Sequence, residues 1–331
     1  MSRLTRSEVN RAGAVRWRHR SLARRALQAT LLLACAFFSL TGYSEPVEPP
    51  WNPPPGDGRN FTVPGIDNVP DLYGDIVDPQ LVVFFAGNQY MVVHDLVNAF
   101  RSAHPQYQRI FVETLPPGVL AEQIEQGALI VGNLRIALKP DVYATGRSRI
   151  EQLQQQHQWF SENVDYARNR LAIMTRAGNP HGIEHWQDLA RAELPVCMPN
   201  PKWEGIAVNA IIPMLRESGG DALVDRIYRQ KAQEGGTLLT QIHHRQTPLW
   251  IMAGRCEAGA VWYTEAYFHS SLAAHGIGTV ELATAENRFV TYTAALMKNA
   301  PHRQAGQAFL RFLVSTQGQA IYQRYGFLPP P

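Results

Sequence analysis

The sequence predicts an α/β fold in which two sheets are joined by a crossover. Residues 81–85 form a continuous apolar run, typical of a strand buried on both faces, and an amphipathic helical pattern follows directly. The order of strand, turn and helix returns in residues 110–127. A buried run in residues 258–263 indicates a second sheet, and residues 166–175 have the pattern of a strand that crosses between the two.

Two turns in the first of these stretches are candidates for ligand binding. The turn Ala86-Gly87-Asn88 leads into a helix with an apolar stripe at helical spacing: Val92, Val93, Leu96, Val97 and Phe100. The second turn, residues 114–118, follows the second strand. Each turn would place backbone N–H groups and a helix N-terminus at the carboxyl edge of the sheet, a ready site for an anion.

The rest of the chain continues the α/β pattern in smaller pieces. Residues 127–139 are expected to end a helix and add a short extended segment, and Thr247 is expected to cap a helix with Pro248 in its first turn. The further expected strands are residues 140–146, 194–198, 236–241, 279–281 and 292–297. The further expected helices are residues 147–159, 184–189, 206–217, 305–314 and 317–325.

The first 44 residues differ in composition from the rest of the chain. They hold eight arginines and one acidic residue, and the apolar run 29–40 is too short for a comfortable membrane span. This pattern fits a secretory signal peptide, with an N-terminal anchor as the alternative. Cys35 resembles a lipidation site and Arg24-Arg25 a twin-arginine signal, but the Sec route fits the segment better.

The basic excess of the chain lies in this leader. Without its eight arginines and one glutamate, the 31 basic and 28 acidic residues fall to 23 and 27, a net charge of −4. The overall basic balance therefore gives no reason to expect nucleic acid as a partner. Residues 45–79, rich in Pro, Gly and Asp, are expected to form a tether or a segment laid over the surface.

Two cysteines, Cys197 and Cys256, remain after the leader. One disulfide and two buried thiols are equally good interpretations of this pair. The sequence has no paired-cysteine zinc pattern, no nucleophile or H-E-x-x-H motif, and neither a P-loop nor a G-x-G-x-x-G fingerprint. We therefore expect no cofactor, no metal and no enzymatic activity.

The cluster His243-His244-Arg245 directly precedes the predicted helix start at Thr247. It could place cationic donors at a helix N-terminus, where charge and dipole together would hold an anion. The alternative is a solvated polar turn. A metal site is the weaker hypothesis, since adjacent side chains on a strand point to opposite faces.

Other candidate contacts lie at the ends of predicted strands. Asn88 either offers its side chain to a ligand or caps the helix that begins there. Thr114 and Thr145 carry hydroxyls that can donate to an anion or form turns. Tyr263 ends a buried strand, so its ring is expected to be partly core, with the hydroxyl at the edge.

Trp203 and Glu204 precede a turn at Gly205. A carboxylate beside an anion is unfavourable. Glu204 would therefore have to pair with Arg245 or accept from a protonated group of the ligand.

Several stretches, taken in their order along the chain, resemble the periplasmic solute-binding proteins of ABC importers, specifically the molybdate-binding-like (type II) group. The resemblance covers most of residues 81–328, and its most specific stretch is the C-terminal one. It is carried by LVVFFAGNQYMVVHDLVNAFRSAHP, PPGVLAEQIEQGA, PDVYATG, NRLAIMTRAGNP with WQDLA, AGRCEAGAVWYTEA and FLRFLVSTQGQAIYQRYGFLPP.

This resemblance implies a two-lobed periplasmic binding protein (venus-flytrap) fold with crossover strands. One lobe would contain residues 80–167 and 282–331, and the other residues 168–281. It also implies that the lobes close over a small anion, which a monomeric periplasmic protein delivers to an ABC permease in the inner membrane. The alternative is a ligand-sensing accessory protein that signals to a membrane partner.

The chain differs from the molybdate-binding pattern, in which small hydroxyl residues occupy the first two turns. Here Asn88 stands in the first turn, Pro116 and Pro117 remove two N–H donors from the second, and residues 129–139 resemble an insertion. The ligand therefore stays open between molybdate, another oxyanion and a small organic anion. The predicted ligand contacts, with Arg245 as charge partner, are Asn88, Thr114, Gly118, Thr145, Trp203, Glu204, Arg245 and Tyr263.

Overall fold

The computed structural model describes residues 61–62, 70–131, 134–202, 204–241 and 243–331. They belong to one of the two units into which the chain divides, Pro49–Pro331. The predicted leader, with Cys35, and the predicted contact Trp203 lie outside the described residues. No helix within the described ranges is long and apolar enough to cross a membrane.

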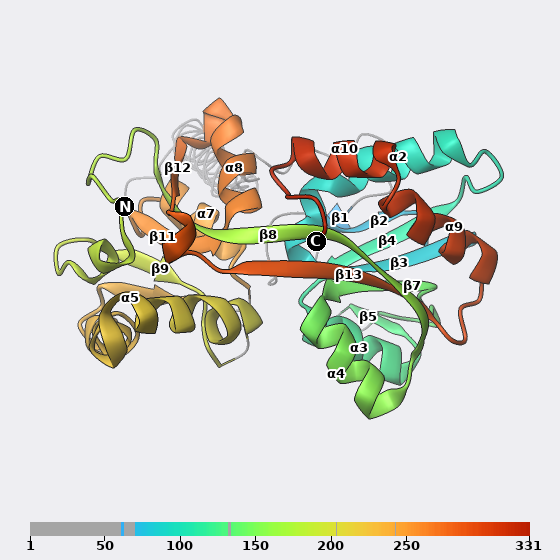
Figure 1. Ribbon diagram of the computed structural model, residues 1–331, viewed down its shortest axis with the longest axis horizontal. Helices are drawn as coiled ribbons and strands as arrows, with labels where there is room; N and C mark the ends of the chain where they lie inside the picture. Colours follow the sequence, from blue (N-terminus) through green and yellow to red (C-terminus); the bar gives the residue numbers. More distant parts are fainter. Residues whose placement is uncertain (1–60, 63–69, 132–133, 203, 242) are drawn as a thin grey trace, which may run out of the picture. The chain divides into compact units, whose positions relative to one another are not determined.

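A mixed sheet runs through this unit in the order β1-β2-β4-β3-β7-β13-β8-β11-β9-β10, with β12 paired to β8 (Figure 1). The first group of strands contains β1 (Phe61–Thr62), β2 (Pro70–Gly74), β3 (Leu81–Ala86), β4 (Ile110–Leu115) and β7 (Val142–Gly146). The second group contains β9 (Val196–Met198), β10 (Thr237–Leu239), β11 (Ala258–Trp262) and β12 (Ile277–Glu281). In each group the central strands are parallel, as the strand-turn-helix pattern requires.

Strand β3 is apolar along its whole length because helices cover both of its faces. Leu81, Val83 and Phe85 belong to one core cluster, whereas Val82 and Phe84 belong to another. Successive strand residues point to opposite faces, so a strand between two helical layers cannot alternate with polar residues. The first cluster contains residues of α2 (Val93–Ala103), α9 (Arg303–Leu313) and α10 (Thr316–Arg324), and the second residues of α3 (Pro117–Gln126) and α4 (Arg147–His157).

The second group of strands is covered by α5 (Ile212–Asp225) and by several shorter helical segments. The shorter segments are η2 (Trp186–Ala190), η3 (Ala207–Ile211), η4 (Arg226–Gln230), α6 (Lys231–Gln233), α7 (Gln246–Met252), α8 (Tyr263–Ser271) and η5 (Ala273–His275). The helix predicted over residues 206–217 begins as the π-helix η3 and continues to Asp225, with a break at Gly219-Gly220. Gly220 has φ +70°, a conformation that glycine adopts at little cost.

The predicted crossover is confirmed by β8 (Phe160–Arg176) and β13 (Phe289–Met297). Residues 160–170 of β8 pair with β13, while residues 171–176 pair with β11 and β12 of the second group. Both strands are visible running between the two groups in Figure 1. The exact division into lobes at residues 167/168 and 281/282 remains a prediction.

A disulfide joins Cys197 of β9 to Cys256, which precedes β11. The Cα atoms are 5.9 Å apart, and 59 positions separate the residues in sequence. Both cysteines are buried in the same cluster of the second group. Of the two interpretations that the sequence left open, the structure therefore has the disulfide.

Three local expectations differ from the structure. Helix α7 begins at Gln246 with Arg245 as its N-cap, so the prediction that Thr247 caps it was wrong; Thr247 is buried inside the helix. Asn88 does not cap a helix, because it lies within the 3-10 helix η1 (Gly87–Val92), whose N-cap is Ala86. The predicted extension in residues 127–139 forms a small hairpin of β5 (Leu129–Val131) and β6 (Leu134–Ile136).

Part of the predicted tether belongs to the sheet. Strand β2 pairs antiparallel with β4, and its Leu72 is fully buried. Gly74 ends this strand with φ +91°, and a Cβ there would lie 2.0 Å from the Ile110 carbonyl oxygen. Only glycine permits this close approach.

Candidate functional site

A cavity of about 990 Å³ is lined by both groups of elements. From the first group it takes the turn after β3 and the first turns of α3 and α4, and from the crossover residues 289–292 of β13. From the second it takes residues 204–206 and 209–210, Gln241, His243-His244 and Trp262. A cavity of this volume admits a tetrahedral oxyanion or a small organic molecule.

The N-termini of α3 and α4 both open into the cavity. Their N-caps are Pro116 and Gly146, and neither first turn contains an acidic residue or a side-chain cap. The backbone N–H groups of a first helical turn have no acceptor within their own helix. A Cβ built at Gly118 or Gly146 would meet no atom within 4 Å, so these turns are open on their cavity side.

Charged side chains of both signs surround these helix ends. Arg147 pairs with Asp165, through an Nε–Oδ1 bond of 3.2 Å and a second bond from Nη2. Arg149 donates to Gln152 Oε1 at 2.8 Å, and the described residues offer it no ion pair. Glu122 and Glu151 also line the cavity. Arg149 is therefore the cavity cation whose charge is least neutralised by a neighbouring carboxylate.

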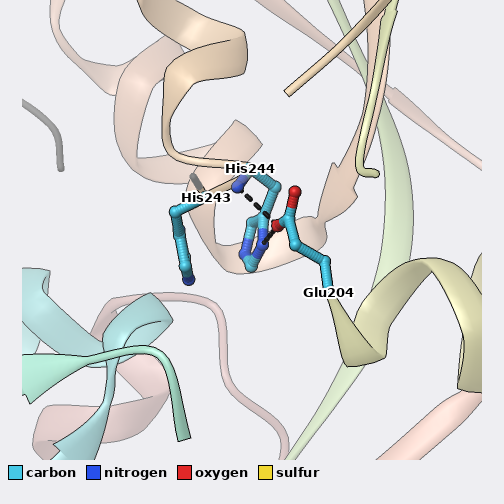
Figure 2. A group of neighbouring side chains, drawn as sticks. All are labelled: Glu204, His243 and His244. Atoms are coloured by element: carbon cyan, nitrogen blue, oxygen red, sulfur yellow. Dashed lines mark hydrogen bonds and ion pairs between the residues drawn. The ribbon is translucent and has the colours of Figure 1, made fainter. Parts of the chain in front are cut away.

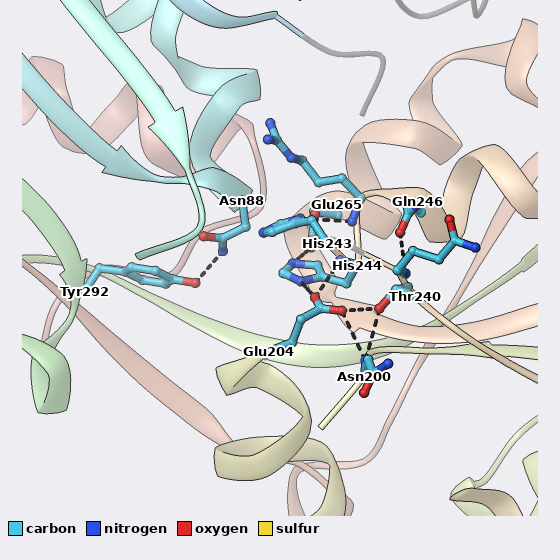
Figure 3. A network of polar contacts seen from close by, with 11 residues as sticks. Asn88, Asn200, Glu204, Thr240, His243, His244, Gln246, Glu265 and Tyr292 are labelled. Atoms are coloured by element: carbon cyan, nitrogen blue, oxygen red, sulfur yellow. Dashed lines mark hydrogen bonds and ion pairs between the residues drawn. The ribbon is translucent and has the colours of Figure 1, made fainter. Parts of the chain in front are cut away.

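On the opposite wall, Glu204 is held by four hydrogen bonds (Figures 2 and 3). Oε1 accepts from the backbone N–H of Asn200 at 3.1 Å and from the Thr240 hydroxyl. Oε2 accepts from the backbone N–H of His244 at 2.6 Å and from its Nδ1 at 2.7 Å. Its charge partner is thus His244, whereas the sequence pointed to Arg245 or the ligand.

His244 lies between two carboxylates. Its Nε2 is 3.1 Å from Glu265 Oε2, while its Nδ1 bonds Glu204. Burial alone would lower the pKa of His244, but Glu265 and Glu204 together outweigh this effect and raise the pKa to about 10. The His244 ring is therefore a buried cation at neutral pH.

His243, unlike His244, is neutral. Its ring is 4.0 Å from that of His244, and its Nδ1 accepts from the backbone N–H of Arg245 at 3.1 Å. Burial, together with the charges of His244 and Arg245, lowers the pKa of His243 well below its usual value. This side chain is a neutral imidazole that lines the cavity.

The residues Glu204, His243 and His244 could also be considered as ligands of a metal ion. Ligand atoms of Glu204, His243 and His244 lie within 4.8 Å of one another. Both Glu204 oxygens and His244 Nδ1 are hydrogen-bonded, and His244 Nε2 lies 3.1 Å from the Glu265 carboxylate. His243 accepts an N–H at Nδ1, so its proton is on Nε2. Metal-bound neutral histidines instead donate from the second nitrogen. The donor set is thus occupied by hydrogen bonds and an ion pair within the protein and does not fit an ion.

Only some of the predicted ligand contacts line the cavity. Asn88, Gly118, Thr145 and Glu204 line the cavity, and Trp203 is outside the described residues. The other three predicted contacts, Thr114, Arg245 and Tyr263, lie outside the cavity wall.

All three have other partners: Arg245 donates to the Thr114 carbonyl, and Tyr263 contacts two further residues. The Tyr263 hydroxyl donates to Glu281 at 3.2 Å, and the Arg170 guanidinium lies 3.5 Å from the centre of its ring. The Asn88 amide, which does line the cavity, donates to the Tyr292 hydroxyl of β13. This bond ties the first turn to the crossover and orients Asn88 (Figure 3).

The alternative interpretation of residues 243–245 as a solvated polar turn was wrong, because all three side chains are at least 95% buried. His243 and His244 also lie in a turn, not on a strand. The argument that adjacent side chains point to opposite faces, used against a metal site, therefore did not apply. The sequence reasoning overlooked Ser148, Arg149, Asn209 and Gln241 as cavity residues. One signal was present: residues 147–149 start a helix right after a buried strand and contain no acidic residue.

With this geometry established, comparison with known proteins gives the class. The chain belongs to the family of bacterial extracellular solute-binding proteins, whose profile matches residues 81–328. Members of this family bind solutes and are not enzymes, as the sequence predicted. The comparison with curated proteins gives no match.

Solved structures show the same fold. The periplasmic molybdate-binding protein of Azotobacter vinelandii is 16% identical, with 76% of this chain and 100% of that chain covered and a TM-score of 0.60. The substrate-binding domain of a putative molybdenum ABC transporter from Clostridium difficile is 16% identical, with 76% and 99% covered and a TM-score of 0.55. The sulfate-binding protein SubI of Mycobacterium tuberculosis is 18% identical, with 75% and 86% covered and a TM-score of 0.58.

These likenesses establish the two-lobed periplasmic binding protein fold, and the predicted fold class is confirmed. At 16–18% identity these likenesses show the fold alone.

Proposed function

We propose that the protein captures a small anion in the cavity, as a periplasmic component of ABC-type import. The observation that carries this proposal is the convergence of the α3 and α4 N-termini on one cavity, with no acidic residue in either first turn. Unpaired N–H groups and the helix dipole both favour negative charge at such a place. Arg149 adds a cation at the same end.

The proposed contacts from the first group are Asn88, Gly118 and Thr145, joined by Arg149. The proposed wall on the second side is the Glu204–His244 pair with His243. Because Glu204 is neutralised by a protonated His244, its carboxylate would not repel an anion as a free carboxylate would. Molybdate and sulfate, which the names of structural neighbours mention, are candidates beside small carboxylates.

A thermal-shift screen tests this proposal. The panel contains sodium molybdate, sulfate, phosphate and citrate, with sodium chloride at matched ionic strength. A ligand that binds only the folded state raises the melting temperature in a concentration-dependent way. We expect at least one panel anion to do so, and less strongly in Arg149→Gln. A panel without any shift, or a shift that Arg149→Gln leaves unchanged, would count against an anion held at these helix ends.

A further inference from the structure

His243 carries a hydrogen-bond donor that the surrounding network does not use. Its Nδ1 accepts the backbone N–H of Arg245 at 3.1 Å, so this nitrogen holds a lone pair. A neutral imidazole with an accepting Nδ1 carries its proton on Nε2. Within the described ranges, no protein group accepts a hydrogen bond from Nε2.

The neighbours of His243 keep the ring in this form. The protonated His244 ring is 4.0 Å away, and a second positive charge at that distance in a buried site would be repelled. Glu204 and Glu265 occupy both nitrogens of His244, which fixes the position of this cation. The turn therefore presents a neutral N–H donor whose tautomer is set by the backbone.

Nε2 is directed at the cavity wall of the first group of elements. His243 is 3% exposed and lines the cavity. A Cβ built on Gly87 would lie 3.2 Å from Nε2 and 3.4 Å from the carbonyl carbon of Leu115. Nε2 thus faces the start of η1 and the end of β4, the segment that leads into α3, where Gly87 has no side chain to fill the space.

Nε2 opens to the cavity, and an N–H that faces a cavity without a protein acceptor is available to a ligand atom that can accept its hydrogen bond. We propose that His243 is a direct ligand contact, and that its Nε2–H donates to an anionic oxygen of the ligand beside the α3 N-terminus. The ligand class is an oxyanion or carboxylate, because its oxygens accept hydrogen bonds and its negative charge is favoured at the neighbouring helix N-termini. This inference rests on the proposed function. It adds His243 as a residue that requires a hydrogen-bond acceptor in the ligand beside the α3 N-terminus.

Calorimetric titration with sodium molybdate, sulfate, phosphate and citrate tests the contact. His243→Ala removes the donor, whereas His243→Gln retains an amide N–H near the position of Nε2. His94→Ala, on the exposed face of α2, is the matched control. For the panel anion that binds wild type most tightly, we expect roughly 10- to 100-fold weaker binding to His243→Ala, as for a lost bond to a charged group. His243→Gln should recover most of the affinity, and His94→Ala should equal wild type.

A second readout needs no change at His243. Long-range ¹H–¹⁵N spectra of the wild-type histidines should show one ring protonated only at Nε2, and that signal should move when the anion is added. A purely structural histidine would keep its signal. Gly87→Ala, which crowds Nε2 with a Cβ, should also weaken binding while the protein stays folded.

The outcomes separate the two proposals. Wild-type binding together with unchanged affinity in His243→Ala, or with an Nε2 signal that does not move, overturns the role of His243 and leaves the proposed function standing. Failure of wild type to bind any of the four anions overturns the proposed function and the inference with it.

Discussion

The guanidinium Nη2 of Arg245 donates to the backbone carbonyl of Thr114 at 3.2 Å. The sequence pointed to both residues as ligand contacts, and the structure joins them to each other. The same guanidinium lies 5.5 Å from the centre of the Tyr90 ring in η1. Arg245 therefore links the turn before α7 to β4 and η1 and does not line the cavity.

Arg245→Ala should destabilise the ligand-free protein. The substitution removes a buried hydrogen bond from a charged group, which contributes about 1.5–3 kcal/mol to the free energy of unfolding. Urea unfolding measures the change, and Arg216→Ala, at an exposed ion pair with Asp221, is a control expected to cost less than about 1 kcal/mol. Unchanged stability combined with lost anion binding would instead make Arg245 a ligand contact.

Stability should fall as the pH rises above about 6.5, through His244. The folded state holds the His244 proton up to a pKa of about 10, whereas the unfolded chain releases it near pH 6.5. Unfolding therefore releases a proton within this window, and linkage lowers the free energy of unfolding with increasing pH. Urea midpoints at pH 7 and pH 9 should differ in wild type and differ less in His244→Gln. Equal slopes in the two proteins would contradict a protonated His244.

Stability should also fall as the pH drops below about 6.5, through His269. This side chain bonds the Tyr90 hydroxyl at 2.8 Å and His275 Nδ1 at 3.0 Å. Burial, with His275 close by, lowers the pKa of His269 to about 3, so unfolding takes up a proton between pH 6.5 and 3.

The acidic slope from this single group should approach about 1.4 kcal/mol per pH unit. It should be reduced by roughly that amount in His269→Gln, measured by urea unfolding between pH 4 and 6. A wild-type slope that survives the substitution would assign the proton uptake to other groups.

The Cys197–Cys256 disulfide should stabilise the second group of strands. It closes a loop of 59 positions, and a cross-link of this kind contributes about 2–4 kcal/mol to the free energy of unfolding. The Cys197→Ala/Cys256→Ala protein should unfold at lower urea concentration, and reductant should shift wild type toward it. Wild type that unfolds identically with and without reductant would show that the bond does not contribute.

The main elements of the fold could be predicted because buried positions are occupied by apolar residues in a regular pattern. Strand β3 is a continuous apolar run since both of its faces are covered. Helix α8 was overlooked because its first turn buries the polar side chains Thr264 and Glu265, so it has no apolar stripe. Strand β2 was overlooked because it is short, and its one fully buried apolar residue, Leu72, gives no period.

The site was less predictable because its polar residues are arranged by tertiary contacts. Asn88, Gly118 and Thr145 were found because each follows or ends a strand at a sheet edge. The pairing of Glu204 with His244 joins residues 40 positions apart, and no local pattern encodes it. The same is true of Arg245 and Thr114, which are 131 positions apart.

The central claim, an anion bound at the N-termini of α3 and α4, is tested most directly by calorimetric titration of Gly118→Val. A Cβ built at residue 118 meets no protein atom within 4 Å, so a valine there should extend into the cavity without disturbing the fold. Ala103→Val, on the exposed end of α2, is the matched control. We predict that the panel anion that binds wild type most tightly binds Gly118→Val at least about tenfold more weakly, and binds the control as it binds wild type. Equal affinity for wild type and a folded Gly118→Val would contradict the account.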